Sequence, residues 1–570
     1  MKLESLKSVE LNGVEIPNRV QVPDFANENN LCDRIFGALC RINPELPCMS
    51  DAKFLRRVFS CIESANGQSF LPLNWKDKAF DIVTYMKTDA TVAKWRDFYA
   101  EEKIRKANYR AANKEVIAKQ KEELKAKFGT AIVNGVEEPL QSYALEPEGI
   151  FFGRGDSPIN GYWKFENKPE DLRLNITSKS MPVLIWNKGE EKIFSEFDNW
   201  NVQWNPDAHF AAQYLIKIGI PDAEGNIKEE KASKYKMIQF AATSSVKKEG
   251  QSKKYAAATE LGKAYNKILA QVKKDFEEVP AKNLSTAVAV FMLFEKGIRI
   301  GFAGETANGT KGLLALKWDK DVKRVGNKIK FDFYGKDSVR DTSVLETEFA
   351  DVIEACWSLN ERLDTNKFEI KEYIGKLAPA IKDVFSPKLC RTAVAAAVMT
   401  KALEDATAKY KLTTESTDAL KKLAFNEANM AVAKRLNHQR GVSKAAEAKR
   451  EAANTEKKAK LEDRAEKVKE LNRKRKESIA KIKAAKKEGW KDRVAKLEEM
   501  IAKSNEKLQQ SKLDLKFKVE NGNITGSTSK AAYIDPSIVA EWCSSVNLSL
   551  DKIYTKGQIV QFSQFFGEEL

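Results

Sequence analysis

A long charged segment, residues 443–515, constrains the fold of this chain more than any other feature. It consists mainly of Lys, Glu, Ala, Arg and Leu, which favour helices, and it contains one glycine, Gly489. A charge run is usually only a solvated helix face, but apolar residues recur here at heptad spacing on both sides of the sequence KKEGW. They are Leu461, Val468 and Ile482 before it, and Val494, Leu497, Ile501, Leu508 and Leu515 after it. Two narrow apolar seams separated by a break predict an antiparallel coiled-coil hairpin that projects as an arm.

A compact sequence, GSTSKAAYIDPSIVAEWCSSVNLSLDKIY, begins at Gly526, after this arm. Its aromatic and branched apolar residues predict a small folded domain, because a solvated tail would not need such residues. Pro536 is a good first residue for a helix, so Tyr533 is expected just before a helix start. Taken alone, this string predicts only a packed tyrosine.

The rest of the chain predicts several domains of mixed structure. At 570 residues it is too long for one core. Residues 91–128 read as a charged helix, and the segments around residues 149–197 read as short strands and turns. Helical patterns dominate from about Ser245, interrupted by a hairpin around KRVGNK. The pattern is typical of a multidomain α+β protein.

Composition narrows the classes of partner. The chain has 97 Lys and Arg against 81 Asp and Glu, a formal charge of +16, which favours a polyanion: nucleic acid first and an anionic membrane second. The longest apolar run, TAVAVFMLF, is too short to span a bilayer, and the N-terminal sequence lacks the apolar region of a signal peptide. We therefore expect a soluble, intracellular protein with no membrane partner.

Two kinds of cofactor site are not expected. The seven cysteines include no C-x-x-C pair, which disfavours a disulfide framework and a thiolate zinc site. No His, Asp and Glu residues have metal-ligand spacing, so no metal is predicted. The sequence GETANGTKG, residues 304–312, resembles a phosphate-binding loop, but its Gly-Thr-Lys order is wrong, so no nucleotide cofactor is predicted either.

Several basic residues are candidates for phosphate chemistry, although each also has a purely structural reading. Arg299 follows an apolar helix and Arg391 begins another, so both could be caps, or both could clamp one phosphate. His438 sits at a helix end among arginines and could donate to a phosphate oxygen. Lys336 lies at a hairpin tip, where a lysine is usually only solvated but could also protonate a leaving oxygen. Arg154 lies in a Gly-rich turn suited to a backbone phosphate contact.

The order of these candidates resembles the catalytic order of the eukaryotic type IB DNA topoisomerases. That order is Arg299, Lys336, Arg391, His438, a coiled coil and then Tyr533. The surrounding strings GIFFGRGDSP, GKDSVR, LCRT, LNHQR and TSKAAYIDPSIVAEWC are also similar to the family. The likeness runs from about residue 70 to the C-terminus.

The resemblance implies an architecture of four parts. An N-terminal cap of mixed α/β structure, residues 1–244, would clamp DNA. A mostly helical catalytic domain related to tyrosine recombinases would occupy residues 245–441. The coiled-coil linker would cover residues 442–515, and a small helical C-terminal domain, residues 516–570, would carry the nucleophile.

The resemblance also implies the chemistry. Tyr533 would attack a backbone phosphate and form a 3′-phosphotyrosine, and the duplex would rotate before religation, which relaxes positive and negative supercoils without ATP or metal. Arg299, Arg391 and His438 would hold the non-bridging oxygens, and Lys336 would be the general acid to the 5′-oxygen. DNA contacts are expected from Arg154, Lys317, Lys336 and Lys388. The expected partner is double-stranded DNA, bound by a monomer, with no cofactor. The expected location is the nucleus for a cellular protein, or a viral factory or virion for a viral one.

Two alternatives accompany this reading. Tyrosine recombinases share much of the constellation, but they usually carry His-x-x-Arg at the second arginine, whereas this chain has Lys388-Leu-Cys-Arg391. A non-catalytic DNA-binding scaffold is the other alternative, which the complete catalytic set disfavours.

The chain departs from the family at Ala532, where cellular relatives usually have Asn, a position that bears on sensitivity to camptothecin-type poisons. Phe152 replaces an arginine of the cap motif.

Overall fold

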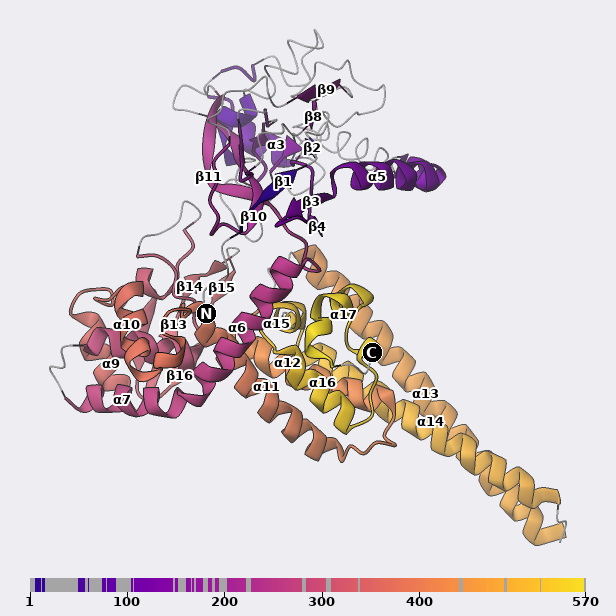
Figure 1. Ribbon diagram of the computed structural model, residues 1–570. Coiled ribbons are helices and arrows are strands. Elements are labelled where there is room, and N and C mark those ends of the chain that lie inside the picture. The colour runs from indigo at the N-terminus through magenta and orange to yellow at the C-terminus, as the bar shows by residue number, and fades with distance from the viewer. Residues whose placement is uncertain are drawn as a thin grey trace. The chain divides into compact units, whose positions relative to one another are not determined.

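The chain is mostly helical, with several small sheets, and its residues divide into two compact units (Figure 1). The first unit is Met1–Lys253 with Glu305–Thr310 and Lys336–Ser338, and the second is Lys254–Gly304, Lys311–Gly335 and Val339–Leu570. The computed structural model describes residues 6–11, 13–15, 50–56, 60, 74–77, 79–88, 104–105, 107–146, 149–151, 160–165, 167–168, 171–177, 183–186, 190–193, 202–221, 227–278, 283–303, 309–336, 339–439, 444–485, 489–522 and 524–567.

Strands dominate the described part of the first unit. One sheet has the order β1–β3–β4, formed by Val9–Leu11, Thr130–Val133 and Val136–Pro139. A larger sheet has the order β11–β10–β6–β5 with β7 also on β10, formed by Ile227–Gln239, Phe210–Pro221, Trp163–Lys164, Gly149–Ile150 and Leu172–Leu174. In a third sheet, β2 (Gly13–Glu15) runs parallel to β8 (Val183–Trp186), which pairs antiparallel with β9 (Glu190–Ile193). The predicted short strands of this region are confirmed where the structure describes them.

The described part of the first unit also contains helices and an apolar core. Among its helices are α3 (Ile82–Thr88) and α5 (Lys114–Phe128), and α5 confirms the C-terminal half of the predicted charged helix. Inward-facing residues such as Leu172, Leu174 and Ile218 are almost fully buried. Because alternate residues of a strand face the same side, these short strands can each contribute to one core.

The second unit is built mainly from helices. They are α6 (Ser245–Lys263, which starts in the first unit), α7 (Tyr265–Glu277), α8 (Leu284–Phe291), α9 (Ala350–Ser358), α10 (Lys367–Leu377), α11 (Lys388–Tyr410) and α12 (Asp418–Arg435). Helix α8 carries much of the longest apolar run and is buried nearly all round, which explains why it has no polar face. It continues into a π-helical turn, Met292–Lys296, that ends at Gly297 with φ +64°. Within the described ranges, no helix combines the length and the apolar composition that crossing a bilayer requires.

Short strands flank these helices. The predicted hairpin is confirmed: β12 (Val322–Val325) pairs antiparallel with β13 (Lys328–Phe331), and β16 (Val344–Glu346) adds a third strand. Gly326 takes φ +63° in the connecting turn, a conformation that glycine adopts without strain. A second pair joins β14 (Phe333–Tyr334) to β15 (Arg340–Asp341).

Two long helices, α13 (Lys444–Ala485) and α14 (Gly489–Glu520), lie side by side (Figure 1). They run antiparallel, because Arg475 pairs with Glu498 at 2.7 Å while Arg464 bonds to Ser511. The break between them falls at the predicted KKEGW sequence. Val468 and Leu508, two residues of the predicted seams, are buried among exposed neighbours.

The ends of this helical hairpin are tied together at its base. Gln439 and Ile524 form an isolated antiparallel bridge, and the Thr525 N–H donates to the His438 carbonyl at 2.9 Å. The chain therefore leaves for the hairpin and returns from it at one place in the second unit.

The C-terminal segment packs into the core of the second unit. It contains α15 (Gly526–Ala532), α16 (Pro536–Ser545) and α17 (Lys556–Phe562). The Trp542 ring of α16 lies 6.4 Å from that of Phe425, and its Nε1 donates to Thr407 Oγ1 at 2.9 Å. The buried Lys421 of α12 donates to the Asn547 carbonyl at 3.0 Å. Helices α11 and α12 thus hold the segment that carries Tyr533.

We expect Trp542→Ala to lower the free energy of unfolding by about 3–5 kcal/mol, because it removes a buried aromatic ring and a hydrogen bond. Calorimetric or chemical denaturation measures this change. Leu359→Ala is the control, since Leu359 is 80% exposed and its loss should change stability little. Equal effects of the two substitutions would contradict this description of the core.

Candidate active site

Tyr533 lies between α15 and α16, and hydrogen bonds fix its backbone. The N–H groups of Tyr533 and Ile534 both donate to the Ser529 carbonyl, at 3.0 and 2.9 Å. Asp535 then caps α16 by accepting from the Ser537 N–H at 3.0 Å, and Pro536 begins the helix as predicted. The tyrosine side chain is half-buried, and Arg391 and Arg299 hydrogen-bond to it.

Arg391 is the buried centre of the site. It lies in the first turn of α11, with 3% of its surface exposed, and its guanidinium donates to the carbonyls of Gly297 and Leu436, the latter at 2.9 Å. Its Nη2 also lies 3.1 Å from His438 Nε2, and its Cζ lies 5.1 Å from the centre of the Tyr533 ring. Its Nε is buried with no hydrogen-bond partner among the described residues. An unpaired buried donor of this kind is suited to an anion.

His438 follows the end of α12 and is 4% exposed. Its Nδ1 lies 2.7 Å from Ser529 Oγ, and its ring centre lies 5.1 Å from that of Tyr533. Since an arginine can only donate, the Arg391 contact makes Nε2 of His438 an acceptor. The proton of the neutral ring therefore sits on Nδ1 and is donated to Ser529 in this structure.

Arg299 is held in place by backbone contacts. Its carbonyl accepts from the Leu313 N–H at 2.8 Å, and the Ile300 carbonyl accepts from Leu314 at 3.1 Å. Two glycines allow this close approach: a Cβ on Gly312 would lie 2.4 Å from the Gly301 Cα, and Gly301 itself has φ +68°. Only glycine fits this crossing without displacing the backbone that carries Arg299.

The charges of these residues change their acid–base properties. Burial raises the pKa of the Tyr533 phenol, but the positive charges and hydrogen bonding of Arg391 and Arg299 outweigh it, so the pKa falls below its usual 10.0. Burial lowers the pKa of Arg391 to about 10, which still leaves it protonated at neutral pH. Burial, followed by the charges of Arg391 and Arg299, lowers the pKa of His438 to about 3. The site thus combines a neutral imidazole with two cations that favour an oxyanion.

The structure brings four of the five predicted catalytic residues together: Arg299, Arg391, His438 and Tyr533. The fifth, Lys336, groups with the first unit and is exposed between β14 and β15, at the hairpin end where it is predicted.

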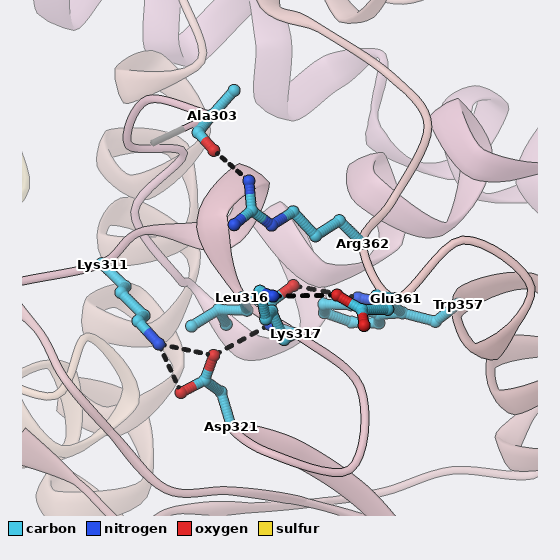
Figure 2. Close-up of polar contacts among 8 residues, drawn as sticks. All are labelled: Ala303, Lys311, Leu316, Lys317, Asp321, Trp357, Glu361 and Arg362. Atoms are coloured by element: carbon cyan, nitrogen blue, oxygen red, sulfur yellow. Dashed lines mark hydrogen bonds and ion pairs between the residues drawn. The ribbon is translucent and has the colours of Figure 1, made fainter. Parts of the chain in front are cut away.

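The predicted DNA contacts are not equally free to bind. Lys388 is exposed on the first turn of α11. Lys317 pairs with Glu361 at 2.9 Å, and its backbone N–H donates to Asp321, as Figure 2 shows. Arg154 lies outside the described residues. Among the residues that the structure describes, no group of His, Cys, Asp and Glu side chains could hold a metal ion.

Three further groups occupy the site that sequence patterns do not reveal. Ser529 bonds to His438, and Lys254 Nζ donates to the carbonyl of Ala532 at 3.0 Å. Burial lowers the pKa of Lys254 to about 8. Lys296, at the end of the π-helical turn, pairs with Asp341 at 3.5 Å, and both side chains are buried. Nothing distinguishes these lysines in the sequence from the many solvated ones.

Comparisons with known protein families match most of the chain. Three family models match in order: "Eukaryotic DNA topoisomerase I, DNA binding fragment" over residues 68–217, "Eukaryotic DNA topoisomerase I, catalytic core" over residues 243–475, and "C-terminal topoisomerase domain" over residues 505–564. The chain belongs to the eukaryotic DNA topoisomerase I family. Within it, Arg299, Arg391 and His438 fall in the region that matches the catalytic core, and Tyr533 falls in the region that matches the C-terminal domain.

Individual relatives are similar at moderate identity. "DNA topoisomerase 1 beta" of Arabidopsis thaliana is 27% identical over 82% of this chain and 49% of its own length. "DNA topoisomerase 1" of Homo sapiens is 27% identical over 78% of this chain and 56% of its own length. "DNA topoisomerase I, mitochondrial" of Homo sapiens is 26% identical over 79% of this chain and 72% of its own length. The chain thus spans about half the length of the first two of these topoisomerase relatives.

We expect one of the two histidines, His438, to stay neutral as pH falls from 8 to 5, because its pKa in the folded chain is about 3. NMR of protein with isotope-labelled histidine side chains follows the protonation of each imidazole as pH changes. The signal that is missing from the His438→Gln variant is assigned to His438. Since an unfolded histidine has a pKa near 6.5, the unfolded state binds more protons between pH 6.5 and 3, so this residue makes acidification destabilising in that window. A His438 signal that titrates near pH 6.5 would contradict the buried geometry.

Proposed function

We propose that this chain is a type IB DNA topoisomerase that relaxes positive and negative supercoils through a 3′-phosphotyrosine, without ATP or metal. The observation that carries the proposal is the packing of the Arg391 guanidinium and the His438 ring against Tyr533, each 5.1 Å from the centre of its ring. A tyrosine that served only as packing would need neither cations nor a neutral imidazole beside it.

The chemistry follows from the acid–base properties of the site. A phenol with a pKa near 10 is a weak nucleophile at neutral pH, and the guanidinium groups of Arg391 and Arg299 lower that pKa. In the proposed step the Tyr533 oxygen gives its proton to water and bonds to phosphorus while the bond from phosphorus to the 5′-oxygen breaks. The 5′-oxygen takes up a proton, for which Lys336 is the proposed donor. Religation is the reverse step, so the phosphotyrosine keeps the bond energy.

Stabilisation of the transition state falls to the two arginines and the histidine. The Nε of Arg391 has no hydrogen-bond partner among the residues described, which supports a bound phosphate at this position, since a buried donor without a partner is costly. Removing one such contact in other enzymes slows the reaction by about 10²–10³-fold. His438 would donate from Nε2 to a non-bridging oxygen.

The four-part architecture remains part of this proposal. The order of the matched family regions supports a DNA-clamping cap (residues 1–244), a catalytic domain (245–441) and a C-terminal domain with the nucleophile (516–570). A relation of the catalytic domain to tyrosine recombinases is also part of the proposal. The proposed coiled-coil linker, residues 442–515, is supported by the antiparallel contacts of α13 and α14. Helix α14 itself continues to Glu520.

Double-stranded DNA is the proposed substrate, bound by a monomer with no nucleotide cofactor. Arg154, Lys317, Lys336 and Lys388 are the proposed contacts to its backbone, which would position the duplex and read little sequence. The proposed compartment is the nucleus for a cellular protein, or a viral factory or virion for a viral one. The name of one relative places that protein in mitochondria.

A strand-exchange recombinase is the competing enzyme class. The Lys-x-x-Arg sequence at Lys388 and the long helical hairpin between His438 and Tyr533 favour the topoisomerase. A non-catalytic scaffold would have no use for a lowered tyrosine pKa.

We expect the chain to relax a supercoiled plasmid stepwise in EDTA without ATP, and we expect Tyr533→Phe to abolish relaxation because it removes the nucleophilic oxygen. Detergent should trap the unsubstituted protein on the 3′ end of the break. Agarose electrophoresis and end-labelled DNA measure both outcomes.

Tyr554→Phe is the matched control, since Tyr554 belongs to the same C-terminal segment and its buried hydroxyl has no hydrogen-bond partner in the part of the chain that the structure describes. It should keep activity. Relaxation that needs ATP or magnesium, or that survives Tyr533→Phe, would refute the mechanism, and product exchange between two duplexes would favour a recombinase.

We expect Lys317→Gln to reduce the slope of log DNA affinity against log salt concentration by about one, because one phosphate contact is lost. Glu361→Gln releases Lys317 from its 2.9 Å ion pair, so this variant should bind DNA equally well or more tightly. Titrations over a range of salt concentrations compare the two. An unchanged slope for Lys317→Gln would show that Lys317 does not contact a DNA phosphate.

A further inference from the structure

Ser529 contacts both Tyr533, the candidate nucleophile, and His438, a candidate phosphate-binding residue. It is fully buried, with 0% of its surface exposed. Its hydroxyl lies 2.7 Å from His438 Nδ1, and its carbonyl accepts the N–H groups of Tyr533 and Ile534 at 3.0 and 2.9 Å. One residue of α15 therefore touches both His438 and the backbone of Tyr533.

In the contacts that His438 makes here, its proton is on the wrong nitrogen to bind phosphate. Arg391 Nη2 donates to Nε2 at 3.1 Å, so the proton sits on Nδ1 and Ser529 accepts it. The ring holds only one proton at neutral pH, because burial and the charges of Arg391 and Arg299 lower the pKa of His438 to about 3. To donate from Nε2, the same neutral ring must become an acceptor at Nδ1.

A hydroxyl is suited to this change because it can either accept or donate by rotating about its C–O bond. While Arg391 donates to Nε2, Ser529 accepts from Nδ1; when Nε2 donates to phosphate, Ser529 donates to Nδ1. A carboxylate at this position would hold the proton on Nδ1, and a methyl group would leave Nδ1 without a buried partner.

We propose that Ser529 is a positioning residue that lets His438 exchange tautomers, so that His438 donates from Nε2 to the scissile phosphate while the Ser529 carbonyl keeps Tyr533 aligned with it. This inference rests on the proposed function. Ser529 does not touch the reacting atoms and acts through His438.

The first test compares Ser529→Ala and Ser529→Cys. Cysteine keeps a side chain of similar size but is a weak hydrogen-bond partner, so it separates hydrogen bonding from packing. We expect both variants to form the covalent complex about tenfold more slowly in single-turnover cleavage, which corresponds to the loss of about one hydrogen bond, with DNA affinity unchanged. Ser527→Ala is the matched control on the same helix: its hydroxyl is exposed and contacts Thr525 at 2.7 Å.

The second test is a double-mutant cycle with His438→Ala. If Ser529 acts through His438, Ser529→Ala should slow cleavage no further once the imidazole is gone. A purely structural role would instead give additive losses. Additive losses, or wild-type rates for both Ser529→Cys and Ser529→Ala, would overturn the proposal.

A third readout does not depend on activity. The ¹⁵N chemical shifts of His438 report which ring nitrogen carries the proton. Binding of a short, intact DNA duplex to the Tyr533→Phe variant should move this proton from Nδ1 to Nε2. We expect this shift to be lost in Ser529→Ala. If the unsubstituted chain relaxes no DNA, the proposed function fails by itself, whereas an unchanged tautomer in an active protein overturns only the role of Ser529.

Discussion

The burial of the Arg391 guanidinium is the interaction on which the rest of the second unit depends. Taking a cation out of water is costly unless acceptors surround it, and here three acceptors come from two separate segments. They are the carbonyl of Gly297 after the π-helical turn, the carbonyl of Leu436 after α12, and Nε2 of His438. The same charge lowers the pKa of the Tyr533 phenol. Folding of the core and preparation of the nucleophile are therefore one event.

Much of this fold could be predicted because its sequence signals are local. Charge and heptad spacing indicated the two long helices, alternating apolar residues around a Gly-Asn turn indicated the β12–β13 hairpin, and Pro536 indicated the start of α16. The π-helical turn at Met292–Lys296 could not be predicted, since its five residues read as a continuation of an apolar helix. What closes it is a tertiary contact, the approach of Gly297 to the Arg435 carbonyl.

The identities of the site residues could be predicted, but their contacts could not. Arg299, Arg391, His438 and Tyr533 were indicated by their order along the chain and by the strings around them. Ser529 gave no signal, because a serine four residues before a tyrosine is unremarkable until the end of α12 brings His438 against it. The same limit applies to the crossing of Gly301 and Gly312, which depends on two backbones that meet only in three dimensions.

The tie at the base of the helical hairpin has a consequence for the history of this protein. Because the bridge from Gln439 to Ile524 fixes both ends, the length of chain between them enters stability mainly through loop closure. Doubling such a segment costs only about 0.6 kcal/mol. Insertions and deletions of whole helical turns there can accumulate with little effect on the geometry around Tyr533, so the hairpin is open to evolutionary change in size.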